Sequence, residues 1–323
     1  MKKLCVAIVA VVLLSAVVTS AYFSWLPQSA EPTTAAISAD SNILARGDYL
    51  FNAVLGCPVC HSERNYAEFG GPPVPPFGGG RACAEPGKPL PGLAESGGLP
   101  GIICFRNITA HQTGIADWTD GEVLRAVREG IGREDQALFP IMPYFIYRNL
   151  SDADAESVVA YVRSLEPVEH ALPDTAINFP VNWLIRLLPE PLSAAVPHPD
   201  ESDPIAYGQY LTTVARCAFC HSPRDARSRQ AIEGLEFAGG VTFQGRNGLL
   251  YSTNLTPHAE GLGNISETEF IALFRRTSNP DAKDLNLMPW TYFGNISDKD
   301  LSAIYSYLQS VPAIRYSPSD YSP

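Results

Sequence analysis

The spacing of apolar residues along the chain predicts helices rather than strands. Apolar residues between 43 and 55, and again in four later segments, recur at intervals of three and four, the period of an amphipathic helix. Polar N-cap signals stand in front of the four later segments. These signals are the capping boxes Thr119-x-x-Glu122 and Ser266-x-x-Glu269 and the serines Ser151 and Ser297. No segment shows sustained strand alternation, so we expect an all-α fold.

The first 26 residues form an apolar segment behind two lysines. Lys2 and Lys3 precede an apolar run from Leu4 to Val18, which is typical of a signal peptide. Apolar character continues to Leu26, so the segment is also long enough for an N-terminal membrane anchor. Both alternatives predict export. Residues 27–42 are rich in Ser, Ala, Thr and Pro, a composition that predicts a flexible tether.

The remainder of the chain repeats itself. Four motifs occur twice in the same order: CxxCH-Ser, Asn-x-Thr-x-His, Met-Pro-aromatic and Asn-x-Ser-Asp. The offset between the copies falls from 160 residues at CxxCH to 147 at Asn-x-Thr, so the first copy holds about 13 additional residues. We predict two tandem domains, at 43–167 and 203–314, with about three main helices each. A structured, proline-rich connector is expected at 168–202 and a tail at 315–323.

Cys-x-x-Cys-His is the attachment sequence of c-type haem. Two thiols at this spacing can form thioethers with the vinyl groups of one haem, and the histidine then ligates its iron. A zinc site or a redox dithiol fits less well, because the two CxxC pairs lie 160 residues apart and no βαβ pattern surrounds them. We therefore predict two covalently bound haem c groups. The predicted haem-binding residues are Cys57, Cys60, His61, Cys217, Cys220 and His221.

A second axial ligand to each iron is expected from methionine. Apart from the initiator, the chain contains only Met142 and Met288, and each is followed by proline and an aromatic residue at the same place in its repeat. A thioether favours ferrous iron and raises the reduction potential. His111 and His258 also match between the repeats and are the alternative ligands. The predicted iron ligands are therefore His61, Met142, His221 and Met288.

The additional residues of the first repeat contain Cys83 and Cys104, which have no counterpart in the second. In an oxidising compartment they predict a disulfide, with a thiolate ligand or a reactive thiol as the alternative. The net charge of −11 disfavours a nucleic acid as partner, because phosphate binding needs a basic surface.

Both repeats resemble class I cytochrome c domains. Details of the second repeat resemble the multihaem cytochrome c subunits of membrane-bound periplasmic dehydrogenases for alcohols, aldehydes or gluconate. They include Gly208-Gln209-Tyr210-Leu211, Cys220-His221-Ser222-Pro223-Arg224, Asn254-Leu255-Thr256-Pro257 and Met288-Pro289-Trp290. The resemblance covers residues 43–314. Those subunits usually have three haem domains and lack the insertion with Cys83 and Cys104, so this chain departs from their pattern.

Together the motifs and the resemblance imply a periplasmic electron-transfer protein rather than an enzyme, either free or tethered to the inner membrane. Electrons would come from a dehydrogenase or quinol and pass to a terminal oxidase or another cytochrome. A dihaem enzyme of the peroxidase or thiosulfate dehydrogenase type is the alternative. Such an enzyme needs one haem with an open coordination position, whereas both repeats offer the same Met-Pro motif.

Overall fold

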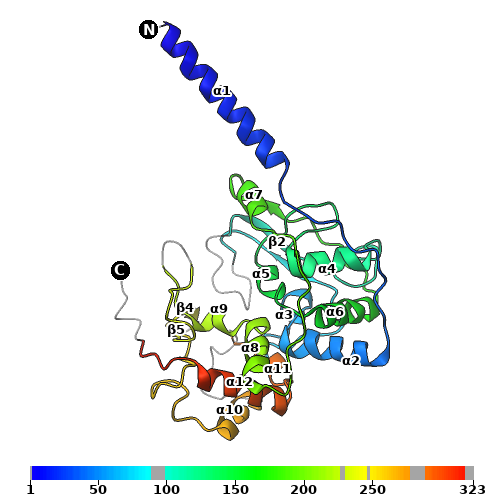
Figure 1. Cartoon of the computed structure of the whole chain (residues 1–323). Helices are drawn as coiled ribbons and strands as arrows, with labels where there is room; N and C mark the ends of the chain where they lie inside the picture. Colours follow the sequence, from blue (N-terminus) through cyan, green and yellow to red (C-terminus); the bar gives the residue numbers. More distant parts are fainter. Residues whose placement is uncertain (1, 89–98, 226–229, 246–247, 277–287, 317–323) are drawn as a thin grey trace.

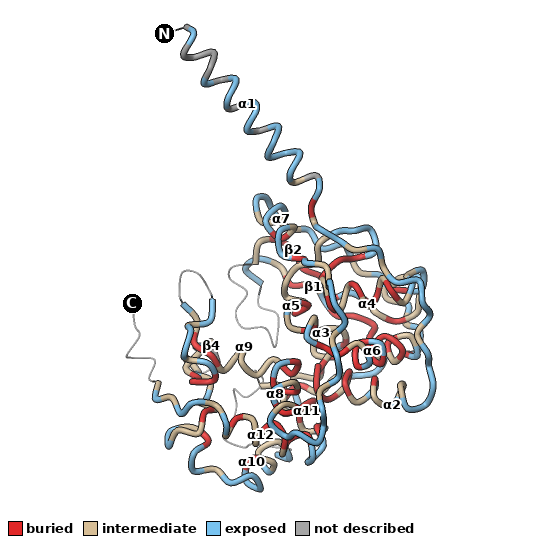
Figure 2. The backbone as a smooth tube through the Cα atoms, viewed as in Figure 1, coloured by how far each residue is buried: buried red, intermediate tan, exposed pale blue. Residues whose placement is uncertain are grey.

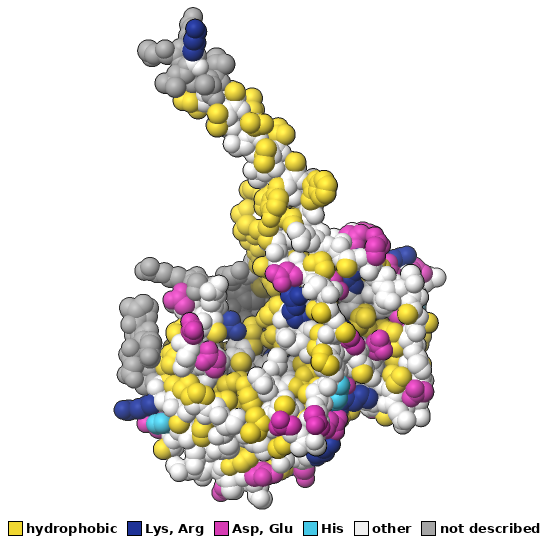
Figure 3. Space-filling view, in the orientation of Figure 1, with side chains coloured by type: hydrophobic (Ala, Val, Ile, Leu, Met, Phe, Trp, Pro, Cys, Tyr) yellow, Lys and Arg dark blue, Asp and Glu magenta, His cyan; other side chains and the backbone are white. Residues whose placement is uncertain are grey.

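The computed structural model describes residues 2–88, 99–225, 230–245, 248–276 and 288–316 (Figure 1). Helix α1 (Lys2–Ser24) projects from a body that contains all the other elements. Among the described residues, no helix combines the length and the hydropathy that crossing a membrane requires. Figure 3 shows hydrophobic side chains along α1 and at its base, where Trp25, Phe179 and Trp183 are exposed.

The main helices of the two repeats pair in the same way. In the first repeat, α2 (Ser41–Tyr49) crosses α6 (Asp152–Ser164), and in the second α8 (Pro204–Val214) crosses α12 (Asp298–Ser310). Glycine makes both crossings possible. A Cβ atom on Gly47 would lie 2.0 Å from the Ser157 carbonyl oxygen, and one on Gly208 would lie 1.9 Å from that of Ala303. A side chain at either position would therefore push the helices apart.

The predicted helix starts are confirmed. Helix α4 (Asp120–Glu129) follows a complete capping box between Thr119 and Glu122, and α10 (Glu267–Phe274) follows one between Ser266 and Glu269. Ser151 and Ser297 cap α6 and α12. Shorter helices lie between the main ones: α3 (Pro58–His61) and α5 (Tyr144–Tyr147) in the first repeat, α9 (Cys217–His221) and α11 (Trp290–Phe293) in the second.

The prediction of an all-α fold is wrong, because the described residues contain two small sheets. Strands β1 (Arg81–Ala84) and β2 (Gly101–Phe105) pair antiparallel, and β3 (Ala176–Ile177) pairs with the other edge of β2. In the second repeat, β4 (Thr242–Gly245) pairs antiparallel with β5 (Gly248–Tyr251). These strands have only two to five residues. Such short runs show no measurable period. Strand β2 pairs with partners from two other segments, whereas β4 and β5 are separated by only two residues.

The segments that flank the first repeat contact it. In residues 27–42, predicted as a flexible tether, the Ala30 carbonyl accepts a hydrogen bond from Arg125 and the Ile37 N–H donates to Asp120. In the connector, β3 joins the sheet, followed by α7 (Val181–Leu184) and the 3₁₀ helix η2 (Ile185–Leu187). The Phe23 ring at the end of α1 lies 5.1 Å from the Trp183 ring of α7, measured between ring centroids.

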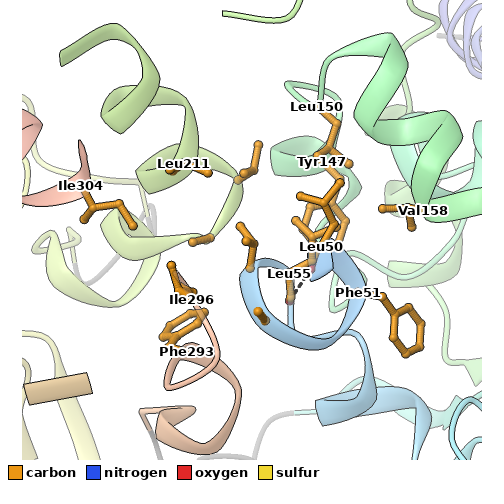
Figure 4. Close-up of a cluster of buried hydrophobic side chains, with 14 of the residues drawn as sticks. Leu50, Phe51, Leu55, Tyr147, Leu150, Val158, Leu211, Phe293, Ile296 and Ile304 are labelled. Carbon is orange, nitrogen blue, oxygen red and sulfur yellow. Dashed lines mark hydrogen bonds between the residues drawn. The ribbon is translucent and has the colours of Figure 1, made fainter. Parts of the chain in front are cut away.

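A single buried core extends through both repeats (Figures 2 and 4). Figure 4 places Leu50, Leu55 and Tyr147 of the first repeat beside Leu211 and Phe293 of the second. Because the apolar side chains are continuous across the boundary, much of the stabilisation of each repeat depends on the other.

Matching tyrosines tie the repeats together across this core. The Tyr49 hydroxyl donates a 2.6 Å hydrogen bond to Asp300 and accepts one from the Ser297 N–H. At the equivalent position of the second repeat, Tyr210 donates a 2.6 Å hydrogen bond to Asp154 and accepts one from the Ser151 N–H. Each tyrosine thus reaches the start of the last helix in the other repeat, which gives the contact an approximate two-fold symmetry.

The helix before the first CxxCH contains a π-helical turn that its counterpart lacks. After α2 the chain forms a π-helix η1 (Leu50–Val54), and the Leu55 N–H donates to the Leu50 carbonyl five residues earlier. Eight positions separate Tyr49 from Cys57, against seven from Tyr210 to Cys217. The wider turn therefore accommodates one additional residue while Tyr49 and Cys57 keep their places.

Candidate haem sites

The first CxxCH motif forms the short helix α3 at the end of the α2–η1 helix. Gly56 precedes it with a φ of 61°, a left-handed conformation that reverses the chain. The His61 Nδ1 atom lies 2.8 Å from the carbonyl oxygen of Arg106. This carbonyl accepts a hydrogen bond, so Nδ1 carries the proton and Nε2 is left free to ligate a metal.

The second CxxCH motif forms α9 with the same geometry. The His221 Nδ1 atom lies 2.8 Å from the carbonyl oxygen of Thr253. Burial lowers the pKa of both imidazoles, and the hydrogen bond to the backbone opposes that effect. Both histidines are thereby held neutral and in one orientation, as axial ligation of iron requires.

Two hydrogen bonds that recur in both repeats hold each histidine in place. The serine after the histidine accepts a backbone N–H: Ser62 from Gly78 and Ser222 from Phe237, each at 3.0 Å. The histidine's own carbonyl also accepts a backbone N–H, from Gly80 at His61 and from Gly239 at His221. The two loops that follow the histidines are therefore fixed by equivalent hydrogen bonds.

The Asn-x-Thr motif positions the carbonyl that each histidine contacts. Asn107 follows Arg106, and its side chain accepts hydrogen bonds from the N–H and hydroxyl of Thr109 while donating to the Val168 carbonyl. Asn254 follows Thr253 and forms the same bonds to Thr256 and the Ile314 carbonyl. The motif thus joins the histidine's acceptor to the segment after the last helix. Sequence reasoning paired these motifs but assigned them no role; their recurrence in both repeats was the available signal.

The four cysteines of the CxxCH motifs form no disulfide, and their surroundings do not favour a thiolate. Burial raises the pKa of the Cys57 and Cys217 thiols to about 12, and it also raises the pKa of Cys60 and Cys220. A redox dithiol needs a lowered thiol pKa, so these environments argue against that alternative. Among the described residues, no group of three or more His, Cys, Asp or Glu side chains could hold a metal ion such as zinc.

Both predicted methionine ligands lie directly before a short helix. Met142 and Pro143 precede α5, and Met288 and Pro289 precede α11. In each case the methionine carbonyl accepts a hydrogen bond from the N–H two residues later, at 2.9 Å and 2.8 Å. Both side chains are partly buried and pack against the core, as do Cys57 and Cys217. Ligation of iron by the two methionines stays a prediction.

The side chains of the alternative ligands His111 and His258 each accept a hydrogen bond from a nearby backbone N–H. The His111 Nδ1 atom accepts from the Thr113 N–H, and the His258 Nδ1 atom accepts from the Glu260 N–H, both at 3.2 Å. A ring that closes its own turn in this way is held by local structure. This favours the methionines as second axial ligands.

The residues around the methionines fit a haem. The Tyr144 hydroxyl and the Trp290 indole Nε1 are buried and have no hydrogen-bond partner among the described residues. These two side chains occupy the same position in the two repeats, directly after Met-Pro. A buried donor without an acceptor is costly, and a haem brings carboxylate acceptors of its own. A matched donor in both repeats is what two haem sites of the same kind would need.

Cys83 and Cys104 form a disulfide. It joins β1 to β2 within the additional residues of the first repeat, and β1 begins directly after Gly80, which holds the His61 carbonyl. Arg64, the third residue after His61, donates to the carbonyls of Gly70 and Gly71 and supports the same region.

Known proteins resemble this chain over most of its length, although no family model matches it. The cytochrome subunit of fructose dehydrogenase from Gluconobacter japonicus is 29% identical over 303 residues, which cover 88% of this chain and 56% of that subunit. The chain is homologous to dehydrogenase cytochrome c subunits. The gluconate 2-dehydrogenase cytochrome c subunit of Pantoea cypripedii is 28% identical over 85% of this chain and 61% of its own length. A "Diheme cytochrome c-type" protein of Cereibacter sphaeroides is 27% identical over 62% of this chain and 68% of its own length.

These matches confirm the resemblance predicted from the motifs. The chain spans less than two thirds of the length of the fructose and gluconate dehydrogenase subunits. It covers rather more, 68%, of the protein described as dihaem.

Proposed function

We propose that this cytochrome c homologue transfers electrons as a subunit of a dehydrogenase complex. Its cofactors are two covalently bound haem c groups. One would be held by Cys57, Cys60 and His61, and the other by Cys217, Cys220 and His221. The observation that carries the proposal is the equivalent setting of the two histidines, each with Nδ1 2.8 Å from a backbone carbonyl. Two sites with the same structure suit two haems with the same function.

The residues of each site serve reversible electron transfer. When bound, haem c supplies a one-electron couple between ferric and ferrous iron. His61 and His221 would each offer the iron a neutral nitrogen that its backbone hydrogen bond holds in one orientation. Met142 and Met288 would fill the opposite position and leave no place for a substrate, which is why we propose a carrier rather than an enzyme.

The partners that we propose are a dehydrogenase that supplies electrons and an oxidase or another cytochrome that accepts them. The relatives are named as subunits of dehydrogenases for fructose and gluconate. The chain's net charge of −11 would steer a partner with a basic surface.

We further propose that the protein acts in the periplasm. The support is the positive and then apolar segment at residues 1–26, which acts as a signal peptide or an anchor, together with the attachment of haem c and the Cys83–Cys104 disulfide. Residues 43–167 and 203–314 would form the two haem-binding domains. Mass spectrometry of the N-terminus and fractionation of the membranes would separate a cleaved signal peptide from a retained anchor.

The test of the carrier is spectroscopy on the full chain produced with a haem-attachment system. We expect two haems per chain, a near-infrared methionine–iron band that accounts for both, and no change on addition of azide. Met142→Ala and Met288→Ala should each remove half of that band and leave the other half. A matched control is His111→Ala, which should keep the whole band.

Different outcomes would overturn different parts of the proposal. A protein with fewer than two haems would refute the assignment of the cysteines. A protein with two haems, one of which binds azide without mutation, would support a dihaem enzyme of the peroxidase or thiosulfate dehydrogenase type instead.

A further inference from the structure

An arginine occupies a turn for which the first repeat uses glycine. Arg216 directly precedes Cys217 and has a φ of 65°. Gly56 holds the equivalent place before Cys57 with a φ of 61°. Left-handed backbone strains any residue that has a Cβ atom, and the first repeat makes the same turn without that strain. The side chain of Arg216 is therefore not needed for the turn itself.

The Arg216 side chain extends from the second repeat into the first. Its Nη2 atom donates a 3.0 Å hydrogen bond to the carbonyl of Leu55, two residues before Cys57. Its guanidinium carbon lies 5.8 Å from the centroid of the Tyr147 ring, and the Tyr147 hydroxyl donates to the same Leu55 carbonyl. A Cβ atom on Gly56 would lie 3.9 Å from Nη2. The guanidinium thus lies beside the turn that leads into the first CxxCH while its backbone begins the second.

The charge of Arg216 reaches both cysteine pairs. It opposes the rise in pKa that burial gives the thiols of Cys57, Cys60, Cys217 and Cys220. Other arginines act on one pair only: Arg64 and Arg81 on Cys60, and Arg224 on Cys220. Within the described part of the chain, no Asp or Glu forms an ion pair with Arg216, so a carboxylate does not neutralise its charge there.

We propose that Arg216 is a fixed positive charge shared by the two haem sites that raises the reduction potential of both haems. The inference rests on the proposed function, because it requires a haem on each cysteine pair. Reduction adds one electron from the partner dehydrogenase and lowers the charge of the iron by one, with no bond made or broken. A nearby cation in a medium of low dielectric disfavours the more positive ferric state and so favours reduction at both sites.

The test is a spectroelectrochemical titration of the full chain with both haems, for the wild type and for Arg216→Gln, Arg216→Lys and Arg216→Gly. We expect Gln and Gly to lower the equilibrium constant for reduction of both haems about tenfold, which is about 59 mV for each one-electron step. Arg216→Lys should retain most of the wild-type equilibrium constant for reduction at both haems. The glycine variant reproduces the turn of the first repeat, so it keeps the measurement possible if glutamine disturbs folding.

Arg224→Gln is the matched control. Arg224 lies over the Phe219 ring, within the second CxxCH, at 4.6 Å from its centroid. Its loss should lower the potential of one haem only. The proposal is overturned if Arg216→Gln and Arg216→Gly leave both reduction potentials unchanged or change only one of them. It is also overturned if Arg216→Lys lowers the two potentials as much as these variants do. Failure of the proposed function is a separate result, because it would appear in the wild type as a missing haem or an open iron site.

Discussion

The two repeats support their histidines in the same way but differ in the segments around them. Both use a serine, an Asn-x-Thr turn and a backbone carbonyl 2.8 Å from Nδ1. They differ at Gly56 and Arg216, in the π-helical turn, and in the disulfide-linked strands β1 and β2. The shared hydrogen bonds are those that ligation of iron by histidine needs. The differences lie before the cysteines and in the strands β1 and β2. We infer that the repeats share one chemistry and differ in how each is stabilised.

The contact between the repeats shows a similar contrast. Asp154 receives two hydrogen bonds from Arg46 in addition to that from Tyr210. Position 207, which corresponds to Arg46, holds tyrosine in the second repeat, and within the described residues the Asp300 carboxylate accepts a hydrogen bond from Tyr49 alone. The same tyrosine–aspartate bond is therefore reinforced in one repeat and unsupported in the other.

The largest effect is expected where the repeats are alike, at the two helix crossings. Gly47→Ala and Gly208→Ala would each place a methyl group about 2 Å from a backbone carbonyl oxygen. We expect each to lower the free energy of unfolding by about 3 kcal/mol or more, since the crossing helices cannot separate without opening the core. Thermal unfolding followed by circular dichroism and by the methionine–iron band would measure it.

The control for this pair is Gly87→Ala. Gly87 has a φ of 72°, and none of the described atoms lies within 4 Å of the Cβ that alanine would add there. This variant therefore reports the cost of left-handed backbone alone, about 1 kcal/mol. Because one core extends through both repeats, each crossing variant should lose both haem signals in a single transition. Two separate transitions would show that the repeats unfold independently.

Local signals explain which parts of the fold could be predicted from the sequence. The capping boxes at Thr119 and Ser266 and the last helices lie where expected, because caps and helical periods are read within one or two turns. Strand β2 was missed because its partners β1 and β3 belong to other segments of the chain, and β4 and β5 were missed because four residues each are too few to show a period. The π-helical turn left one signal, the single extra residue between Tyr49 and Cys57.

In the candidate site too, some features could be predicted from local sequence and others could not. The cysteines and histidines stand in a motif whose chemistry is local, so the sequence alone predicts them. The acceptors of the histidine N–H groups are backbone carbonyls of Arg106 and Thr253, and a carbonyl has no side-chain signature. The place of Arg216 between the two sites depends on how the repeats pack, which no pattern within either repeat contains.

The next largest effect is expected from removal of the disulfide, which only the first repeat has. Cys83 and Cys104 are 21 residues apart, and a closed loop of this length reduces the entropy of the unfolded chain by about 3 kcal/mol at 25 °C. The double variant Cys83→Ser/Cys104→Ser should lose about that much stability in urea unfolding. A reducing agent should have the same effect on the wild type and none on the variant. An unchanged unfolding curve would show that β1 and β2 are held by their other contacts.

The smallest effect is expected at the tyrosines between the repeats, where it should be unequal. Tyr49→Phe leaves the Asp300 carboxylate, which is only 4% exposed, without its described hydrogen-bond donor, and should cost about 2 kcal/mol. Tyr210→Phe should cost about 1 kcal/mol, because Arg46 still pairs with Asp154. Urea unfolding would measure both, with Tyr305→Phe as a control whose hydroxyl donates to Ile265 within the second repeat.

Alkaline pH should weaken the same bonds in the wild type. Burial and the neighbouring carboxylates raise the pKa of Tyr49 and Tyr210 in the folded protein. The folded state therefore retains the phenolic protons longer than the unfolded chain, whose tyrosines titrate near pH 10. The stability due to these bonds is complete below about pH 10 and is lost as the pH rises above it. Between pH 9 and 11 the double variant Tyr49→Phe/Tyr210→Phe should lose less stability than the wild type. The difference should equal the contribution of the two tyrosines to the pH dependence of the free energy of unfolding. An identical alkaline loss in the double variant would mean that other groups control it and that the symmetric bonds contribute little to holding the repeats together.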